Sequence, residues 1–160
     1  MIFDISKIIK DNYSLLLKDA HISHIILWLF GVPIITSVSL IFFNFKLDSD
    51  QLSSIVSFVS IIIGFLVNVS VILVSIPNSK GLIGNFVKKR NHANIFYTIL
   101  VGILLVVIII MKPWFGFSIP IQKNFLFDFS IIYYFFLYSL FIHFILMILI
   151  VIKAFYALYK

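Results

Sequence analysis

Two polar side chains lie deep inside long apolar runs of this sequence, where a hydrogen-bonding group needs a specific partner. Asn68 is about 14 residues into its run and His143 about 13, so each lies about 20 Å from the start of its run at a helical rise of about 1.5 Å per residue. Their matched depths allow a direct Asn68–His143 hydrogen bond, within one chain or between neighbouring chains. Ser139 precedes His143 by one turn. The ring of His143 is then either a neutral group satisfied by a hydrogen bond or a sensor of protons or ions.

Little other chemistry is visible in the sequence. His21 and His24 are three residues apart, but no third metal ligand lies near them. The chain has no cysteine, and its six acids all lie outside the apolar runs, which argues against thiol chemistry and against proton-coupled export through an intramembrane acid. We therefore expect no enzymatic activity, no cofactor and no bound metal.

The composition indicates which elements must position these side chains. Hydrophobic residues make up 62% of the chain and charged residues 11%, whereas soluble domains are about half apolar and about a quarter charged. Four runs are long enough to cross about 30 Å of hydrocarbon. They are residues 25–45, 54–76, 94–111 and 130–152. The predicted fold is an all-α integral membrane protein, with an N-terminal amphipathic helix over 1–24 and a four-helix transmembrane domain over 25–160.

The basic residues outside these runs predict the orientation of the spans. Nine of the 12 fall before the first span, between the second and third, and after the fourth: Lys7, Lys10, Lys18, Lys80, Lys88, Lys89, Arg90, Lys153 and Lys160. The other three are Lys46, Lys112 and Lys123. The positive-inside rule places both termini in the cytoplasm of a bacterium, with the chain in the inner membrane.

Two segments at the predicted inner face are candidates for contact with lipid or with a partner. Residues 1–24 carry a polar stripe at helical steps, consisting of Asp4, Lys7, Asp11, Ser14 and Lys18. We expect an amphipathic helix on the inner leaflet, or alternatively a docking surface for a cytoplasmic protein. Lys80, Lys88, Lys89 and Arg90 follow the second span, and we expect this cluster to contact anionic lipid or a partner, without direct binding of nucleic acid.

The second span carries small and polar residues along one face. They are Ser53, Ser57, Ser60, Gly64, Asn68 and Ser75. Helices in lipid associate through small residues and interhelical hydrogen bonds, so this face predicts a packing seam. We expect the second span to be buried in protein contacts and the third, which offers only Thr98-x-x-x-Gly102, to face lipid.

Gly31 and Pro33 predict a kink in the first span. Proline removes one backbone donor and clashes with the preceding turn. The hydroxyls of Thr36, Ser37 and Ser39 follow closely and are candidates to satisfy the freed carbonyl. The bend is either static or a hinge.

One resemblance bears on function. It rests on Ile61-Ile62-Ile63-Gly64-Phe65-Leu66-Val67-Asn68, Ser75-Ile76-Pro77-Asn78-Ser79, Leu82-Ile83 and Lys88-Lys89. These segments resemble small four-span proteins of bacterial phage-defence loci, in particular the membrane subunits of Kiwa antiphage systems. The resemblance implies a homo-oligomeric inner-membrane sensor of phage attack that works with a DNA-binding cytoplasmic partner.

Three functional hypotheses remain open. The first is a membrane sensor or scaffold that signals to a cytoplasmic partner, as the resemblance implies. The second is a homo-oligomeric pore or channel in which the seam lines a conduit. The third is an immunity protein that blocks a pore-forming bacteriocin within the bilayer.

Overall fold

The computed structural model describes residues 5–16, 27–75, 82–115, 118–122 and 125–156. The helices are α1 (Ile5–Leu16), η1 (Leu27–Gly31, a π-helix), α3 (Val32–Phe42), α4 (Ser49–Ser75), α5 (Leu82–Ile110), η2 (Lys112–Phe115, a 3-10 helix) and α6 (Phe129–Tyr156). Between η2 and α6 lie two strands, β1 (Ser118–Gln122) and β2 (Phe125–Asp128). The predominantly helical fold predicted from the sequence is confirmed.

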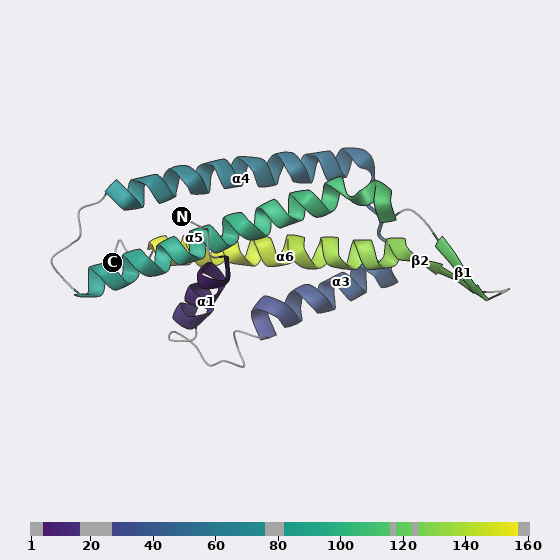
Figure 1. Cartoon of the computed structure of the whole chain (residues 1–160), viewed down its shortest axis with the longest axis horizontal. Helices are drawn as coiled ribbons and strands as arrows, with labels where there is room; N and C mark the ends of the chain where they lie inside the picture. Colours follow the sequence, from purple (N-terminus) through teal and green to yellow (C-terminus); the bar gives the residue numbers. More distant parts are fainter. Residues whose placement is uncertain (1–4, 17–26, 76–81, 116–117, 123–124, 157–160) are drawn as a thin grey trace.

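The long helices form a row rather than a closed bundle. They lie side by side in the order α4, α5, α6, α3, and α1 lies against α5 (Figure 1). Successive long helices run in opposite directions, and the hairpin of β1 and β2 projects beyond one end (Figure 1). Because α5 and α6 occupy the middle of the row, each has neighbours on two sides.

Three helices within the described residues are long and apolar enough to cross a membrane. They are Ser49–Ser75, Asn91–Ile110 and Ser130–Tyr156, which correspond to the second, third and fourth predicted spans. The apolar helical segment in the region of the first predicted span, Leu27–Phe42, is shorter. At about 1.5 Å per residue it covers about 24 Å, less than the ~30 Å of a hydrocarbon core. A fourth crossing therefore stays a prediction, as does the side on which the termini lie.

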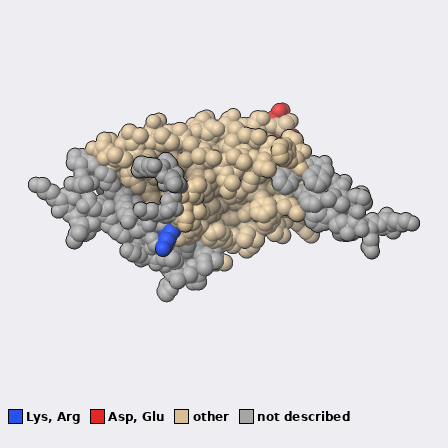
Figure 2. Space-filling view, in the orientation of Figure 1, with Lys and Arg blue, Asp and Glu red and all other residues tan. Residues whose placement is uncertain are grey.

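Charge is scarce on the side of the molecule seen in Figure 2. Among the described residues on this face, acidic atoms appear at the start of α4 and basic atoms at α1, with uncharged surface between them (Figures 1 and 2). Large apolar side chains are exposed along α4, including Ile61, Phe65 and Val71. An uncharged apolar belt of this kind is what lipid requires of a membrane protein.

The connection between α3 and α4 is set by two helix caps. Asn44, at φ 54°, ends α3 in the left-handed conformation, and the next amide, of Phe45, donates back to the Leu40 carbonyl at 3.0 Å. Asp48 then begins α4 through a reciprocal capping box, in which the Gln51 amide donates to Asp48 Oδ1 at 2.7 Å and the Asp48 amide donates to Gln51 Oε1 at 3.1 Å. The cap explains why α4 begins at Ser49, five residues before the apolar run that hydropathy detects.

The basic connection predicted over 77–93 is largely helical, because α5 already begins at Leu82. Lys88, Lys89 and Arg90 therefore belong to α5, in a stretch whose side chains lie outside the described part of the structure, while Lys80 lies outside the described residues altogether. Lysine and arginine are good helix formers, so charge ends a hydropathic window without ending the helix.

The predicted outer loop after the third span contains an antiparallel hairpin, which an all-α description omits. Ser118 pairs with Asp128, and the register shifts between Pro120 and Gln122. Isoleucine and phenylalanine favour extended backbone, whereas hydropathy analysis reads such residues only as apolar.

The predicted burial of the second and third spans is wrong within this chain. Half of the spanning window of α5 is buried but only 17% of that of α4. Gly102 shows why: a Cβ there would lie 2.8 Å from the Phe144 ring and 3.0 Å from Ile63, so its absence lets α5 approach both α6 and α4. A Cβ at Gly64 would meet nothing within 4 Å. The small residue that brings helices together is therefore on the third span, not the second.

Candidate functional site

The candidate site lies where α1, η1, α5 and α6 meet. The amphipathic helix α1 lies against α5 and presents two polar side chains to it. Asn12 Nδ2 donates to Asn94 Oδ1 at 3.0 Å, and the hydroxyls of Tyr13 and Tyr97 are 2.9 Å apart. Ile5 lies two turns before Asn12 and Ile9 one turn before Tyr13, on the same face of α1, and both are exposed. The predicted interfacial helix is thus also attached to the helical row through polar contacts.

A chain of hydrogen bonds continues from Tyr97 into the row. The Tyr97 hydroxyl lies 3.0 Å from His143 Nε2, and His143 Nδ1 lies 2.8 Å from the Leu29 carbonyl oxygen. We call Tyr13, Tyr97, His143 and the Leu29 carbonyl the Tyr–His chain. It joins α1, η1, α5 and α6, and its three bonds connect residues 46, 84 and 114 positions apart in the sequence.

The polarity of the Tyr–His chain follows from its terminal acceptor. A carbonyl can only accept, so His143 Nδ1 must donate to Leu29. In a neutral ring Nε2 then accepts from the Tyr97 hydroxyl, and that hydroxyl accepts from Tyr13. A protonated ring would donate from both nitrogens, which would turn the Tyr97 hydroxyl around and leave Tyr13 as the acceptor. Protonation of His143 therefore reverses the direction of the hydrogen bond that Tyr13 of α1 makes with Tyr97.

Pro33 accounts for the free carbonyl at the end of the Tyr–His chain. Proline has no N–H, so the Leu29 carbonyl, four residues earlier, has no α-helical donor from that position. The π-helix η1 spans this point, and such bulges recur at functional sites. The predicted irregularity at Gly31 and Pro33 is thus a change from π- to α-helix. The predicted hydroxyl partners bond elsewhere: Thr36 and Ser37 donate to carbonyls of Val32 and Pro33, and Ser39 to that of Ile35.

Two aromatic rings, those of Phe30 and Tyr97, contact the imidazole and restrict its orientation. Phe30 stacks on His143 with ring centres 5.6 Å apart, and on Tyr13 at 6.0 Å. Tyr97 meets both Tyr13 and His143 edge-on. His143 is 7% exposed, so its polar atoms depend on these partners rather than on solvent.

Burial raises the pKa of the Tyr13 phenol above its ordinary value of 10, and its hydrogen bond to Tyr97 acts in the same direction. The Tyr13 hydroxyl therefore keeps its proton throughout the physiological range. It remains able to donate into the Tyr–His chain whenever His143 is neutral.

Three buried asparagines lie beside the Tyr–His chain, and we call Asn12, Asn91 and Asn94 the amide cluster. All three are at most 1% exposed. Asn91 and Asn94 are one turn apart on α5, and the hydroxyl of Thr98, one turn further on, donates to the Asn94 carbonyl at 2.7 Å. Within the described part of the chain, Asn91 Nδ2, Asn91 Oδ1 and Asn12 Oδ1 have no hydrogen-bond partner.

Most of the predicted site residues are not assembled by the structure. Asn68 is exposed on α4, so the proposed Asn68–His143 bond is not formed within the chain. Ser53, Ser57, Ser60 and Gly64 share that exposed face, so the predicted seam is not buried within the chain. Ser139 is half-buried on α6. His21 and His24 lie outside the described residues.

The sequence reasoning found His143 but missed its partners. Tyr97 and Asn94 stand at the polar end of the third span, where hydropathy treats them as a boundary. Tyr13 is not part of the polar stripe that the sequence predicts for residues 1–24. The signal for Leu29 was present, because a proline identifies the carbonyl four residues earlier as unpaired.

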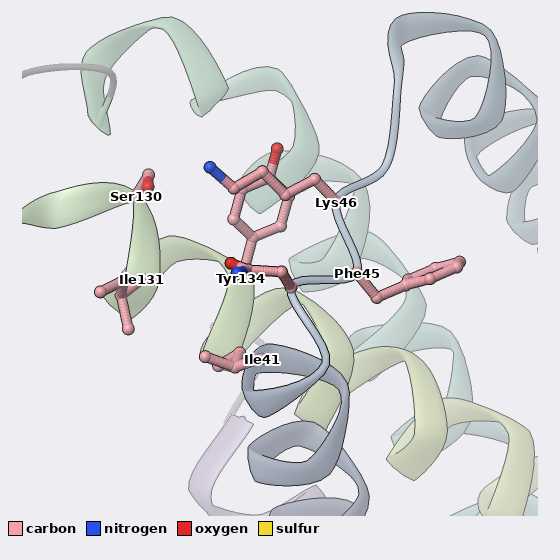
Figure 3. Close-up of a pocket in the computed structure, with 7 residues that line it drawn as sticks. Ile41, Phe45, Lys46, Ser130, Ile131 and Tyr134 are labelled. Carbon is pink, nitrogen blue, oxygen red and sulfur yellow. The ribbon is translucent and has the colours of Figure 1, made fainter.

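A separate small cavity lies at the other end of the row. It has a volume of about 110 Å³ and is lined by Ile41, Asn44, Phe45, Lys46, Ser130, Ile131 and Tyr134. Lys46 and Tyr134 overlap in the view of Figure 3, whereas the Phe45 ring points away from them. The Tyr138 hydroxyl donates to the Phe45 carbonyl at 2.5 Å, which ties the α3–α4 connection to α6. We attribute this cavity to the packing of the α3–α4 connection against α6 and not to a binding site.

Family models, curated proteins and solved structures give no match to this chain. The case for a function therefore rests on the geometry of the Tyr–His chain and its surroundings.

Proposed function

We propose that this chain is a bacterial inner-membrane sensor or scaffold subunit that acts through helix contacts and not through catalysis. The observation that carries the proposal is the Tyr–His chain, which couples a histidine at the middle of α6 to the docked position of α1. A change in the row, such as movement of α6 against α5 or protonation of His143, breaks or reverses these bonds. The consequence is a change in how firmly α1 is held.

The position and surface of α1 support its assignment as the output element. It contacts mainly α5, and Ile5, Ile9 and Lys10 are exposed, so part of its surface remains accessible. The basic residues of the first turns of α5 belong to the same predicted inner face. A cytoplasmic partner that reads α1 would therefore also meet positive charge.

The test is co-purification from the native host in mild detergent, with variants at the two ends of the row. We expect one cytoplasmic protein to co-purify with the wild type and to be lost with Lys10→Glu on α1. The matched control, Lys46→Glu, reverses an exposed charge at the other end and should retain the partner. Equal retention of the partner by both variants would contradict the assignment of α1.

We further propose that the chain is a homo-oligomer that associates through the exposed polar face of α4. Asn68 lies in the middle of a spanning helix, and an amide facing hydrocarbon without a partner is costly. Ser60 and Gly64 on the same face allow a second helix to approach closely. A second copy would offer the same amide in return.

Cross-linking in lipid bilayers tests this association. The chain has no cysteine, so Ser57→Cys and Ser60→Cys can each be introduced into an otherwise thiol-free background. We expect rapid disulfide-linked dimers from these variants and few from Leu104→Cys on the exposed side of α5. Asn68→Leu should reduce the yield, whereas equal dimer formation at all three positions would indicate random collision.

The phage-defence setting rests on the resemblance of residues 61–68, 75–79, 82–83 and 88–89 to Kiwa membrane subunits. We propose that the stimulus is phage attack. Deleting the gene from its native locus should raise the plating efficiency of at least some phages, and only a variant with an intact Tyr–His chain should restore protection. A change in bacteriocin sensitivity without any change in plating would favour an immunity protein instead.

A further inference from the structure

The amide cluster contains buried atoms whose hydrogen-bonding needs no described residue meets. Asn91 is 1% exposed and both polar atoms of its side chain lack a partner; Asn12 is fully buried and its Oδ1 lacks one. Leaving such an atom unpaired is costly, and more than about 90% of buried polar groups in proteins are paired. Three unpaired atoms in one place therefore point to an occupant that is not part of the chain.

The chemistry of these atoms narrows the occupant. Asn91 presents both an N–H donor and a carbonyl acceptor, and rotating its amide only exchanges the two. A bare cation would satisfy the oxygen alone, and an anion the N–H alone. The occupant must both donate and accept, and the near-complete enclosure of Asn12 and Asn91 requires it to be small. Water meets these conditions, because buried water typically makes two to four hydrogen bonds to such groups.

Helix geometry places this site beside the Tyr–His chain. Asn91 and Asn94 are one turn apart on α5, and Asn94 holds Asn12. Tyr13, the next residue of α1, meets Tyr97, which is one turn beyond Asn94. Asn91 directly follows the basic residues Lys88, Lys89 and Arg90 in α5. Polar groups thus continue from that end of the span to His143.

We propose that Asn12, Asn91 and Asn94 hold ordered water at the contact between α1 and α5. This water supplies exchangeable protons to the Tyr–His chain from the end of the molecule where α1 lies. This water would be present whether or not the chain signals to a partner, because only the hydrogen-bonding needs of the buried amides require it.

Water-edited solid-state NMR tests the proposal directly on the full chain in lipid bilayers, with labelled asparagine. We expect polarisation from water to reach the side-chain amides of Asn12 and Asn91 as fast as that of the exposed Asn44, in spite of their burial. Asn91→Leu should slow the transfer to Asn12 severalfold, whereas Asn91→Ser, which keeps a donor and an acceptor, should preserve it. The matched control, Asn68→Leu, should change nothing at Asn12.

Three outcomes would overturn the proposal. If the wild-type Asn91 amide receives water polarisation no faster than residues of the apolar core, the site is dry; this spectrum alone decides the matter if Asn91→Leu fails to fold. A shift of the Asn91 signal when sodium or potassium chloride replaces choline chloride would identify a cation in place of water. Hydrogen–deuterium exchange at His143 Nδ1 that is as fast in Asn91→Leu as in the wild type would refute proton access through this site.

Discussion

Two helices of this molecule carry a stripe of small and polar residues, and the structure treats the two in opposite ways. The α4 stripe, consisting of Ser53, Ser57, Ser60, Gly64 and Asn68, is exposed. The α5 stripe, consisting of Asn91, Asn94, Thr98 and Gly102, is buried among α1, α4 and α6. The spacing of small residues thus identifies a face of a helix but not what covers it. Position in the row decides that, because α5 has neighbours on both sides and α4 lies at an edge.

The largest contrast should come from removing the polar side chain at mid-depth of a spanning helix, either His143 of α6 or Asn68 of α4. His143→Leu leaves the Leu29 carbonyl without its side-chain donor and Tyr97 without its acceptor, at about 1–3 kcal/mol for each buried group. We expect a loss of about 3 kcal/mol in unfolding free energy for His143→Leu and little change for Asn68→Leu in the monomer. Unfolding in mixed micelles, followed by circular dichroism, measures both. If Asn68→Leu proves the more damaging, Asn68 has a partner that the single chain does not contain.

The next contrast compares the two glycines. Gly102→Ala places a Cβ 2.8 Å from Phe144 and 3.0 Å from Ile63, so both side chains must shift, at an overpacking cost of about 1–3 kcal/mol. Gly64→Ala meets nothing within 4 Å and removes a glycine from a helix interior, which stabilises by up to about 1 kcal/mol. The thermal midpoint should therefore fall for the first variant and hold or rise for the second. A lower midpoint for Gly64→Ala only at high protein concentration would reveal an interface between copies.

These contrasts show how far the sequence determines the fold. Hydropathy located three of the long helices, because the cost of exposing polar backbone to lipid forces apolar runs to be helical. It missed the true start of α4, since Asp48 and Gln51 form a cap that involves no apolar residue. It also missed the helical first turns of α5, where charge interrupts the apolar run but not the backbone.

The candidate site was harder to predict than the fold. His143 stood out because an ionisable group within a span needs a partner. Its partners come from η1, α5 and, through Tyr97, α1, and their approach depends on the order of helices in the row. Equal depth in the membrane suggested Asn68 as the partner of His143. Depth gives only the position along the membrane normal, however, and α4 is separated from α6 by α5. Pairing across helices requires the lateral order, which no periodicity in one helix contains.

A smaller effect is expected where α1 meets the α5 stripe, and it should depend on pH. Tyr13→Phe keeps the ring but removes one hydrogen bond, which is worth about 0.5–1.5 kcal/mol of α1 docking. The pKa of Tyr13 is raised when α1 is docked and returns towards 10 when α1 is released. The contribution of Tyr13 to docking is therefore independent of pH below about pH 10. It decreases as the pH rises above about 10, since the released form then loses its proton.

A spin label on α1, attached after Lys10→Cys, reports this release through its mobility. The label should become mobile above about pH 10 with Tyr13 present, and Tyr13→Phe should abolish the alkaline step that Tyr13 contributes. The helical signal in circular dichroism serves as the control against unfolding of the whole row. An alkaline step of the same size in both variants would assign it to another group.

The smallest and sharpest contrast concerns two hydroxyls with the same local bond. Thr98 Oγ donates to the carbonyl four residues earlier at 2.7 Å, and Ser57 Oγ does the same at 3.0 Å, but Thr98 is fully buried and Ser57 is exposed. Thr98→Val removes a buried hydrogen bond next to the amide cluster and should cost about 1 kcal/mol. Ser57→Ala removes the corresponding bond at an exposed position and should cost less than about 0.5 kcal/mol in the monomer. The unfolding free energy of Ser57→Ala should be measured both in dilute micelles and in bilayers. Because the local geometry at Ser57 matches that at Thr98, a larger loss in bilayers than in micelles would come from a surface that a second copy covers.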